Sequence, residues 1–299
     1  MVLAGLALAV ALAQAAAPHQ TPPQTDETVP AARGGRLTVN NFAGEVIIHT
    51  WDKDAVHVVA RHQSRTRVDI QQSAAGVHLS ASGSRGPQGS VDYDITAPGW
   101  MPIRVEGQFN FITIEGAQAE VSAESVRGDI VIKGGTGRVT AKSIEGEILV
   151  EGARGKVNVS SVNEGIRMSD TTGDIVAESV NGAITMTRMD SKSVEASTVN
   201  GNISYDGTLP DGAHYVFTTH NGDLLMGIPD TANATFTIRT YNGEFRTDLP
   251  VQGGGREEIR RGRRVSLTLG TGSADVNLES FGGTIRVRKG TVTRSRGRE

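Results

Sequence analysis

The chain has 299 residues, of which 37 are glycine, and its formal net charge is −3. It contains no cysteine, which excludes a disulfide framework, thiol catalysis and a lipidated cysteine. Aromatic residues make up only 4% of the chain, so it offers few platforms on which sugars or bases could stack.

The first 33 residues resemble an export signal followed by a linker. Residues 1–17 are apolar apart from one glutamine and end in small residues, among them Ala13, Ala15 and Ala17, as at a secretory cleavage site. A basic residue at the start is missing, and a short uncleaved membrane anchor is the alternative. Residues 18–33 are rich in Pro, Thr and Gln and are predicted to be a disordered linker. We therefore expect an exported protein that is periplasmic, on the outer surface or secreted.

Residues 34–105 are predicted to form a strand-rich N-terminal β segment that caps the rest of the chain. Residues 56–60 alternate apolar and other side chains, which is typical of a strand with one buried face.

Residues 106–206 hold a sequence repeat, which predicts a repeat architecture. Glycine recurs every nine residues, and an aliphatic residue follows each of these glycines by two positions. The full period is 18, because residues 125–130 return at 143–148 and again at 179–184, with weaker half-units between them. The glycines of the nine-residue spacing are Gly128, Gly137, Gly146, Gly155, Gly173 and Gly182.

Apolar residues alternate within each half-unit, which predicts strands with one buried face. Because nine is odd, each half-unit must also contain a corner where the alternation slips, and a glycine there can adopt backbone angles that other residues avoid. An antiparallel hairpin meander is one way to arrange such halves. Recurrence of like residues every 18 positions favours coils that stack on one another instead. The predicted fold is all-β, a single-stranded β-solenoid similar to a parallel β-helix, with 18-residue coils about 4.8 Å apart.

Residues 207–290 are predicted to form looser C-terminal β coils. The motif recurs there at spacings of 19 and 21, and residues 280–285 close the series after a longer gap. Residues 291–299 form a basic tail. Residues 256–299 carry 11 Lys and Arg against 5 Asp and Glu, a balance of +6. This balance suits an anionic surface such as lipid headgroups or acidic polysaccharide, and a solvated loop and tail are the alternative. Nucleic acid is not expected as a partner, because the basic clusters have no interleaved aromatic residues.

The chain also resembles a known family. A Trp-Asp element at residues 50–54, the entry to the coils at residues 97–105, the Ser-Val-Asn-Gly-x-Ile coils and the ending at residues 283–288 are similar to the bacterial "putative adhesin" β-strand-repeat family. The resemblance covers about residues 34–290. It implies an exported β-solenoid of unknown function, with no assigned reaction and no catalytic residue to transfer.

One position of the repeat holds asparagine five times, each two residues after a Ser or Thr. In stacked coils these residues would form a structural turn ladder, since Asn-Gly suits tight turns and each amide can bond the one above. A ligand-binding face is the alternative. The five residues are Asn163, Asn181, Asn200, Asn221 and Asn242.

The position after the glycine is often acidic. Carboxylates on one outer face could perform acid–base work on polysaccharide or bind calcium, but the calcium-binding nonapeptide of β-rolls is absent, and a solubilising face also explains them. Glu164 stands where a glycine is expected, either as a functional carboxylate at a bend or as a local bulge. The acidic residues are Asp129, Glu147, Asp174, Asp223 and Glu244.

No other residues form a recognisable site. His57 and His62 fall on opposite faces of a strand, and His49 and His78 could approach across strands without a fixed geometry. Serines occur without a nucleophile motif. We therefore expect no catalytic residue, no metal and no cofactor. The expected function is a non-enzymatic envelope or surface scaffold, adhesin-like, that binds polysaccharide or another envelope protein. A carbohydrate-active β-helix enzyme, a lyase or hydrolase, is the rival.

Overall fold

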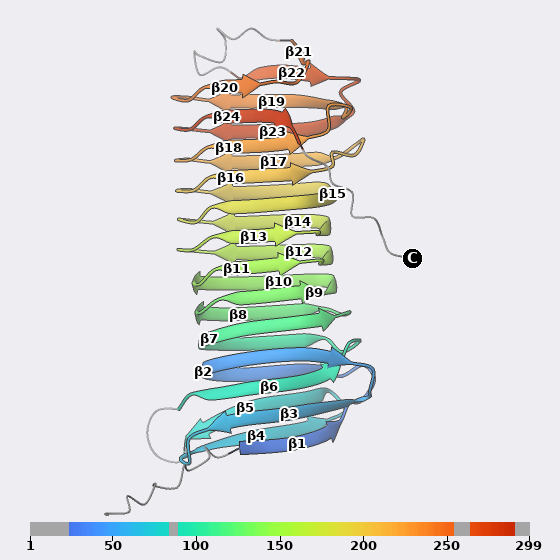
Figure 1. The fold of residues 1–299 in the computed structure, drawn as a ribbon, viewed down its shortest axis with the longest axis vertical. Helices are drawn as coiled ribbons and strands as arrows, with labels where there is room; N and C mark the ends of the chain where they lie inside the picture. Colours follow the sequence, from blue (N-terminus) through green and yellow to red (C-terminus); the bar gives the residue numbers. More distant parts are fainter. Residues whose placement is uncertain (1–23, 84–88, 254–263, 291–299) are drawn as a thin grey trace, which may run out of the picture.

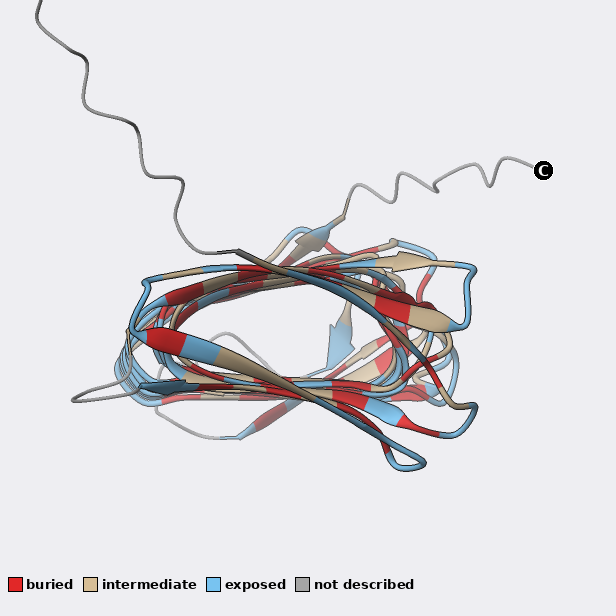
Figure 2. Ribbon diagram, turned by 90° about the horizontal axis from the view of Figure 1, so that it is seen from below, coloured by how far each residue is buried: buried red, intermediate tan, exposed pale blue. Residues whose placement is uncertain are grey.

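The computed structural model of the protein describes residues 24–83, 89–253 and 264–290. Over these residues the chain is all-β, with 24 strands in one hydrogen-bonded sheet and no helix. The strands stack along the long axis (Figure 1). Seen along that axis they form a flattened ring around a buried interior (Figure 2). The predicted signal (1–17) and basic tail (291–299) lie outside the described residues.

The ring has two long walls joined by corners. We name the walls by the strands that pair within them. In spatial order the first wall contains β4 (Thr66–Ser73), β5 (Gly76–Gly83), the first part of β2 (Arg36–Trp51), the first part of β7 (Ile103–Ala117), β8 (Val121–Arg127), β10 (Thr136–Glu145), β12 (Arg154–Ser161), β14 (Thr172–Ser179), the second part of β15 (Ile184–Thr198), β17 (His214–Thr219), β23 (Ala274–Ser280), β19 (Ala234–Thr240), β22 (Val265–Leu269) and β21 (Gln252–Gly253).

The second wall is built from the strands that alternate with these along the sequence. It contains β1 (Gln24–Pro30), β3 (Ala55–His62), β6 (Val91–Pro98), the second parts of β2 and β7, β9 (Ile130–Gly134), β11 (Ile148–Glu151), β13 (Ile166–Ser169), the first part of β15, β16 (Ile203–Gly207), β18 (Leu224–Ile228), β24 (Ile285–Lys289) and β20 (Phe245–Thr247).

The pairing register in the central part follows the sequence repeat. Val139 pairs in parallel with Val121 on one side and Val157 on the other, and Ile148 pairs likewise with Ile130 and Ile166. Each of these partners lies one full period of the repeat away. The predicted stacking of like on like is confirmed for these strands. A hairpin meander is excluded there, because the pairing is parallel.

The interior is filled by the alternating apolar residues that the sequence pattern singled out. In β12 the burial alternates from Val157 through Val159 to Ser161, and the residues between them face outward. The buried residues of both walls form one continuous core along the whole stack. Period-two alternation therefore sets the strands, and closure of the ring buries one face of each.

At the corner that follows the first wall, glycine is required by close approach of stacked turns. A Cβ added at Gly201 would overlap the backbone carbonyl of Gly182, and one at Gly222 would overlap that of Gly201. Neither glycine has a positive φ. At this corner the expectation that glycine serves unusual backbone angles holds for Gly128, whose φ is 117°, and is wrong for Gly201 and Gly222. It also holds at the opposite corner, where Gly155 and Gly173 have φ of 110° and 113°.

The N-terminal region differs from the prediction in two respects. Residues 18–33 were expected to be a disordered linker, but Gln24–Pro30 form β1, which pairs antiparallel with β3. The regular winding also begins before residue 106. β2 pairs in parallel with β7 along both walls, so that Leu37 meets Ile103 and Val46 meets Ile112. Strands β3–β6, inserted between β2 and β7, cover the end of the stack with antiparallel pairs.

At the other end, the spatial order of the strands departs from their order in the sequence. β23 pairs with β17 on one side and with β19 on the other, and β24 lies in the same way between β18 and β20. The last turn is thus inserted between two earlier turns (Figure 1). Residues 280–285 close the series in the sequence but not in space, because β19 and β20 lie beyond them and β22 pairs antiparallel with β19.

Candidate functional site

The corner that leads from the first wall to the second carries a buried column of hydroxyl side chains. The Thr198 hydroxyl donates to the carbonyl of Gly182 in the preceding turn, at 3.0 Å, and Thr219 donates to the Gly201 carbonyl at 2.8 Å. The Ser179 hydroxyl accepts from the Gly182 amide at 2.9 Å. These bonds satisfy backbone groups at the bend in the turns from Ser179 to Thr219, whereas the buried hydroxyls of Ser143 and Ser161 have no hydrogen-bond partner.

The residue after each buried hydroxyl points outward, and it is apolar or aromatic in every turn from β8 to β20. We call this row the edge stripe. Its seven aliphatic, Phe and Tyr members are 37–46% exposed although their side chains are large. With turns about 4.8 Å apart, eight positions extend over roughly 34 Å. In spatial order the edge stripe contains Val126, Ile144, Val162, Val180, Val199, His220, Phe281 and Tyr241.

The far end of the edge stripe is a pile of three rings. His220 stacks on Phe281 with centroids 4.7 Å apart and planes at 10°, and Phe281 lies 5.1 Å from Tyr241. The guanidinium of Arg239 lies over the ring of Tyr241, 4.6 Å from its centroid. Phe281 therefore lies between two rings, and Tyr241 has both Phe281 and the Arg239 guanidinium against its ring.

A shallow cavity of about 470 Å³ lies beside this pile. Its lining combines apolar and aromatic residues, Val199 and the three rings, with hydroxyl-bearing residues and Glu279. Its lining consists of Ser179, Ser197, Thr198, Val199, Thr218, Thr219, His220, Tyr241, Glu279 and Phe281. A side chain with an apolar body and a polar end fits this lining.

Four of the five predicted ladder asparagines are brought together. The amide Nδ2 of Asn181 donates to Oδ1 of Asn163 at 3.0 Å, that of Asn200 to Asn181 at 2.9 Å, and that of Asn221 to Asn200 at 2.9 Å. Asn242 is separated from them. The inserted β23–β24 turn places Gly282 at the ladder position beyond Asn221, and the Asn242 backbone amide bonds to Phe281.

The acidic residues after the glycine do not converge. Asp129 accepts the Glu147 backbone amide at 2.8 Å, and Asp223 accepts that of Thr284 at 2.7 Å, so both carboxylates bond the backbone of the next turn. Glu147 forms an ion pair with Arg167 at 2.9 Å. Glu244 pairs with Arg246, and Asp174 lies at the opposite corner, at the start of β14.

Glu164 causes no bulge. Ser143 pairs with Ser161 and Ile148 with Ile166, so the register runs through this corner without a shift. The bulge interpretation is therefore wrong. Within the described residues the Glu164 carboxylate has no ion pair, and only its backbone carbonyl accepts a bond, from Ser179 at 3.4 Å.

Two of the three basic residues of β24, Arg288 and Lys289, are paired within the protein. Arg288 lies 3.5 Å from Asp206. Lys289 forms an ion pair with Asp230 and lowers the pKa of that carboxyl through their hydrogen bond. The other basic clusters, residues 260–263 and 294–298, lie outside the described residues.

The tryptophans and histidines of the N-terminal region also make local contacts. Arg33 covers the Trp100 ring at 4.6 Å, and the Trp100 indole donates to Asp54 at 2.9 Å. Lys53 covers the ring of Trp51 at 4.7 Å. His49 faces Glu115 on the second wall, whereas His78 is on β5 in the first wall, so the two do not meet. In the described part of the protein no group of three or more His, Asp or Glu is placed to hold a metal.

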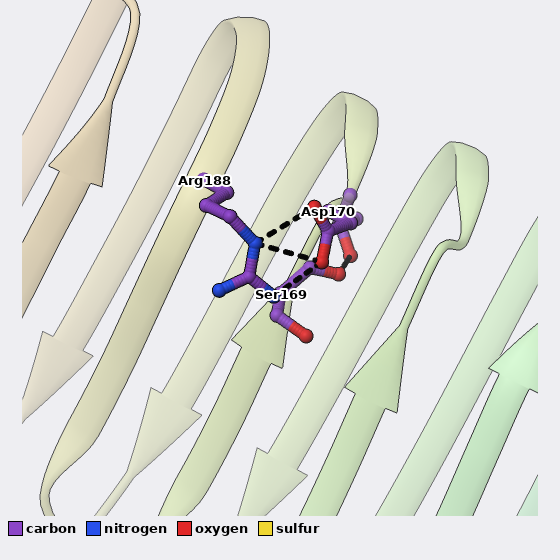
Figure 3. Close-up of polar contacts among 4 residues, drawn as sticks. Ser169, Asp170 and Arg188 are labelled. Carbon is purple, nitrogen blue, oxygen red and sulfur yellow. Dashed lines mark hydrogen bonds and ion pairs between the residues drawn. The ribbon is translucent and has the colours of Figure 1, made fainter. Parts of the chain in front are cut away.

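The opposite corner contains a strained pair. Asp170 and Arg188 occupy equivalent positions one turn apart, with φ of 51° and 53°, where the two preceding turns have Gly134 and Gly152. The Arg188 Nε donates to both Asp170 oxygens at 2.9 and 3.0 Å (Figure 3). This hydrogen bond, with the charge of Asp170, raises the pKa of Arg188.

Sequence reasoning missed the edge stripe. Each member follows the Ser or Thr of the repeated motif, but the residue type at this position varies, whereas glycine and asparagine recur at their positions of the motif and give the clearer signal. The ring pile was hidden for another reason. Tyr241 and Phe281 are far apart in the sequence, and only the inserted last turn places Phe281 between His220 and Tyr241.

Comparison with known proteins adds little to this geometry. No family model and no curated protein matches the sequence. Among solved structures, a "putative cell adhesion protein" from Clostridium sporogenes is similar at 11% identity with a TM-score of 0.23, over 89% of this chain and 100% of that one. None of the described residues forms a helix long and apolar enough to cross a membrane.

Proposed function

We propose that the protein is a non-enzymatic, exported, adhesin-like β-solenoid that acts as an envelope or surface scaffold and binds a partner protein along the edge stripe. The observation that carries this proposal is the edge stripe itself. Seven large side chains that are 37–46% exposed, with His220 between two of them, occupy successive turns, and a contiguous exposed apolar surface is typical of an interaction site. Export is proposed from residues 1–17.

The chemistry of the edge stripe favours a protein over a polysaccharide. Its first five members are aliphatic, and they suit apolar side chains of a partner. Sugars stack on open aromatic faces, but here Phe281 lies between two rings and Tyr241 is covered by Arg239. Charged residues of both signs lie on either side of the edge stripe, where Glu124 pairs with Lys142 and Arg127 pairs with Glu145. Neither a purely acidic nor a purely basic partner is therefore favoured.

A non-enzymatic role is supported by the engagement of the candidate carboxylates. Asp129 bonds backbone and Glu147 bonds Arg167, and a general acid–base pair would need both to face a substrate. The rival, a polysaccharide lyase or hydrolase, requires that changing Asp129 to Asn and Glu147 to Gln abolishes turnover.

The test places a photo-crosslinking residue at Val180 in the full mature protein and, as a control, at Val176, which faces outward from the first wall. Crosslinked envelope proteins are identified, purified and titrated. We expect Val180→Asp and Val199→Asp to weaken binding about tenfold or more, and Val176→Asp to leave it unchanged.

Two outcomes would overturn the proposal. One is a partner whose affinity is insensitive to both edge-stripe variants. The other comes from size-exclusion chromatography with a panel of envelope polysaccharides. Shortened polymer would establish an enzyme. Co-elution of intact polymer with the wild type and with both edge-stripe variants alike would show that the binding face lies elsewhere.

A further inference from the structure

Four Asn-Gly pairs occur in the sequence, and all four lie at the same corner position of their turns, with asparagine at residues 181, 200, 221 and 242. Asn-Gly is the dipeptide in which a side-chain amide most easily reacts with the following backbone nitrogen, because glycine offers no steric barrier. The protein thus contains the same reactive dipeptide at four similar positions. A difference in their reaction rates must therefore come from the contacts that surround each asparagine.

Three of the four side chains are held by the asparagine ladder. Asn181 and Asn200 each make two ladder bonds, one as donor and one as acceptor. Asn221 makes one, as a donor to Asn200, because glycine occupies the next position of the ladder. Each bond must break before the amide carbon can turn toward the backbone.

Asn242 lacks this restraint. The inserted turn separates it from Asn221, and its carboxamide makes no hydrogen bond within the described residues. The backbone is comparable, since the Gly243 amide donates to Thr240 at 3.1 Å as the Gly182 amide donates to Ser179 at 2.9 Å. All four asparagines are exposed to water. The side-chain hydrogen bonds of the ladder therefore distinguish Asn181 from Asn242, whose following glycine amides are held alike.

We infer that Asn242 is a site of spontaneous covalent modification, which deamidates faster than the three ladder asparagines. The Gly243 backbone nitrogen loses its proton and attacks Cγ of Asn242. The new N–C bond closes a five-membered imide, and the bond between Cγ and Nδ2 breaks to release ammonia. Water then opens the imide at either carbonyl and leaves aspartate or isoaspartate. The step needs only water and base.

The modification has a consequence at the edge stripe. It converts a neutral amide into a carboxylate directly after Tyr241, at the end of the ring pile and two residues before Glu244. The inference itself is independent of the proposed function, because it rests on the ladder and not on any partner.

The test incubates the purified full-length protein at mildly alkaline pH, folded and in parallel in urea, and follows each Asn-Gly pair by peptide mass spectrometry. In the folded protein we expect Asn242 to react about tenfold or more faster than Asn200, with Asn221 between them, as expected for roughly two- to tenfold per hydrogen bond. In urea the four rates should converge, because the ladder is gone.

A second variant separates the ladder from other effects. Asn200→Ala removes the acceptor of Asn221 and the donor to Asn181, so both should react several-fold faster while Asn242 is unchanged. Equal rates in the folded protein, or the same ranking retained in urea, would overturn the inference, since the ladder would then not control the reaction.

Discussion

The central and C-terminal parts of the stack are built on the same motif and differ in regularity. From β8 to β14 every turn keeps the period of the sequence repeat, and each turn follows the previous one in space. From β15 onward the turns lengthen, so that Val194 pairs with Tyr215, beyond the regular period, and the last turn is inserted out of order. The difference teaches that the corner motif tolerates longer turns, provided that something fills the wider interior.

Aromatic side chains fill it. The largest fully buried side chains of the C-terminal part are Tyr205, Tyr215, Phe217 and Phe236, whereas the central interior uses Val, Ile, Ala and Met. The longer corners also provide backbone carbonyls that accept hydrogen bonds from the buried tyrosine hydroxyls. The Tyr205 hydroxyl donates to the Thr208 carbonyl at 2.7 Å, and the Tyr215 hydroxyl donates to that of Ser191 at 2.6 Å. Extra corner residues therefore supply both the space and the acceptors.

The largest expected effect is that alkaline pH destabilises the C-terminal part, which contains the buried tyrosines, more than the central part. Burial raises the pKa of Tyr215 to about 12, and burial and the neighbouring Tyr215 raise that of Tyr205. The folded state holds these phenols protonated. Their contribution to the free energy of unfolding is therefore present below pH 10 and is lost as pH rises toward 12. For Tyr215 alone the loss reaches about 3 kcal/mol.

Urea unfolding followed by circular dichroism from pH 9 to 12 measures this loss. Burial also raises the pKa of Tyr93 in β6, so the N-terminal end should weaken too, whereas the central turns contain no tyrosine. Tyr241→Phe, which removes an exposed phenol, is the control and should leave the profile unchanged. A wild-type profile that stays flat to pH 12 would contradict the prediction.

A cavity in each part should have a local effect. Phe217→Ala should cost about 3–5 kcal/mol and Met186→Ala about 2–5 kcal/mol, because both side chains are fully buried. In a stacked array each turn contacts mainly its neighbours, so destabilisation should be local. Hydrogen exchange should show faster opening of β15–β18 and β23–β24 in the first variant, and of β11–β16 in the second. Uniform acceleration along the whole stack in both would show instead a single cooperative unit.

The central part could be predicted from the sequence because its information is local. A period of 18 fixes the register between Val139 and Val157, and two-residue alternation fixes which side chains are buried. The asparagine ladder was predicted for the same reason, since equivalent positions in consecutive turns stack. Where turns follow the order of the sequence, like residues meet.

Where that order fails, the prediction fails with it. Asn242 was placed in the ladder because its motif matches, and only long-range pairing of β23 with β17 and β19 removes it. β1 was missed because its residues are polar, and it forms a strand only through its partner β3. The strand propensity of a segment does not predict such pairings, because the stability of the strand comes from the strand that it pairs with.

The smallest effect concerns the strained corner, where the regular pattern lapses. Arg188 has a φ of 53°, which costs a residue with a Cβ about 1–2 kcal/mol, and its ion pair with Asp170 is exposed and contributes about 0–1 kcal/mol. Arg188→Gly should therefore be more stable than Arg188→Ala by about 1–2 kcal/mol, although both lose the ion pair.

Matched variants at Thr187, one residue earlier, test whether the backbone is the cause. Thr187 has an ordinary negative φ, so Thr187→Ala should there be more stable than Thr187→Gly by about 0.5–1 kcal/mol. Urea midpoints of the four variants decide the matter. If glycine is the worse substitute at both positions, the left-handed backbone at residue 188 is not strained, and Asp170 and Arg188 replace the glycines of the earlier turns at no cost. If glycine is the better substitute at residue 188 and alanine the better one at residue 187, the backbone at residue 188 is strained, and the ion pair forms in spite of that strain.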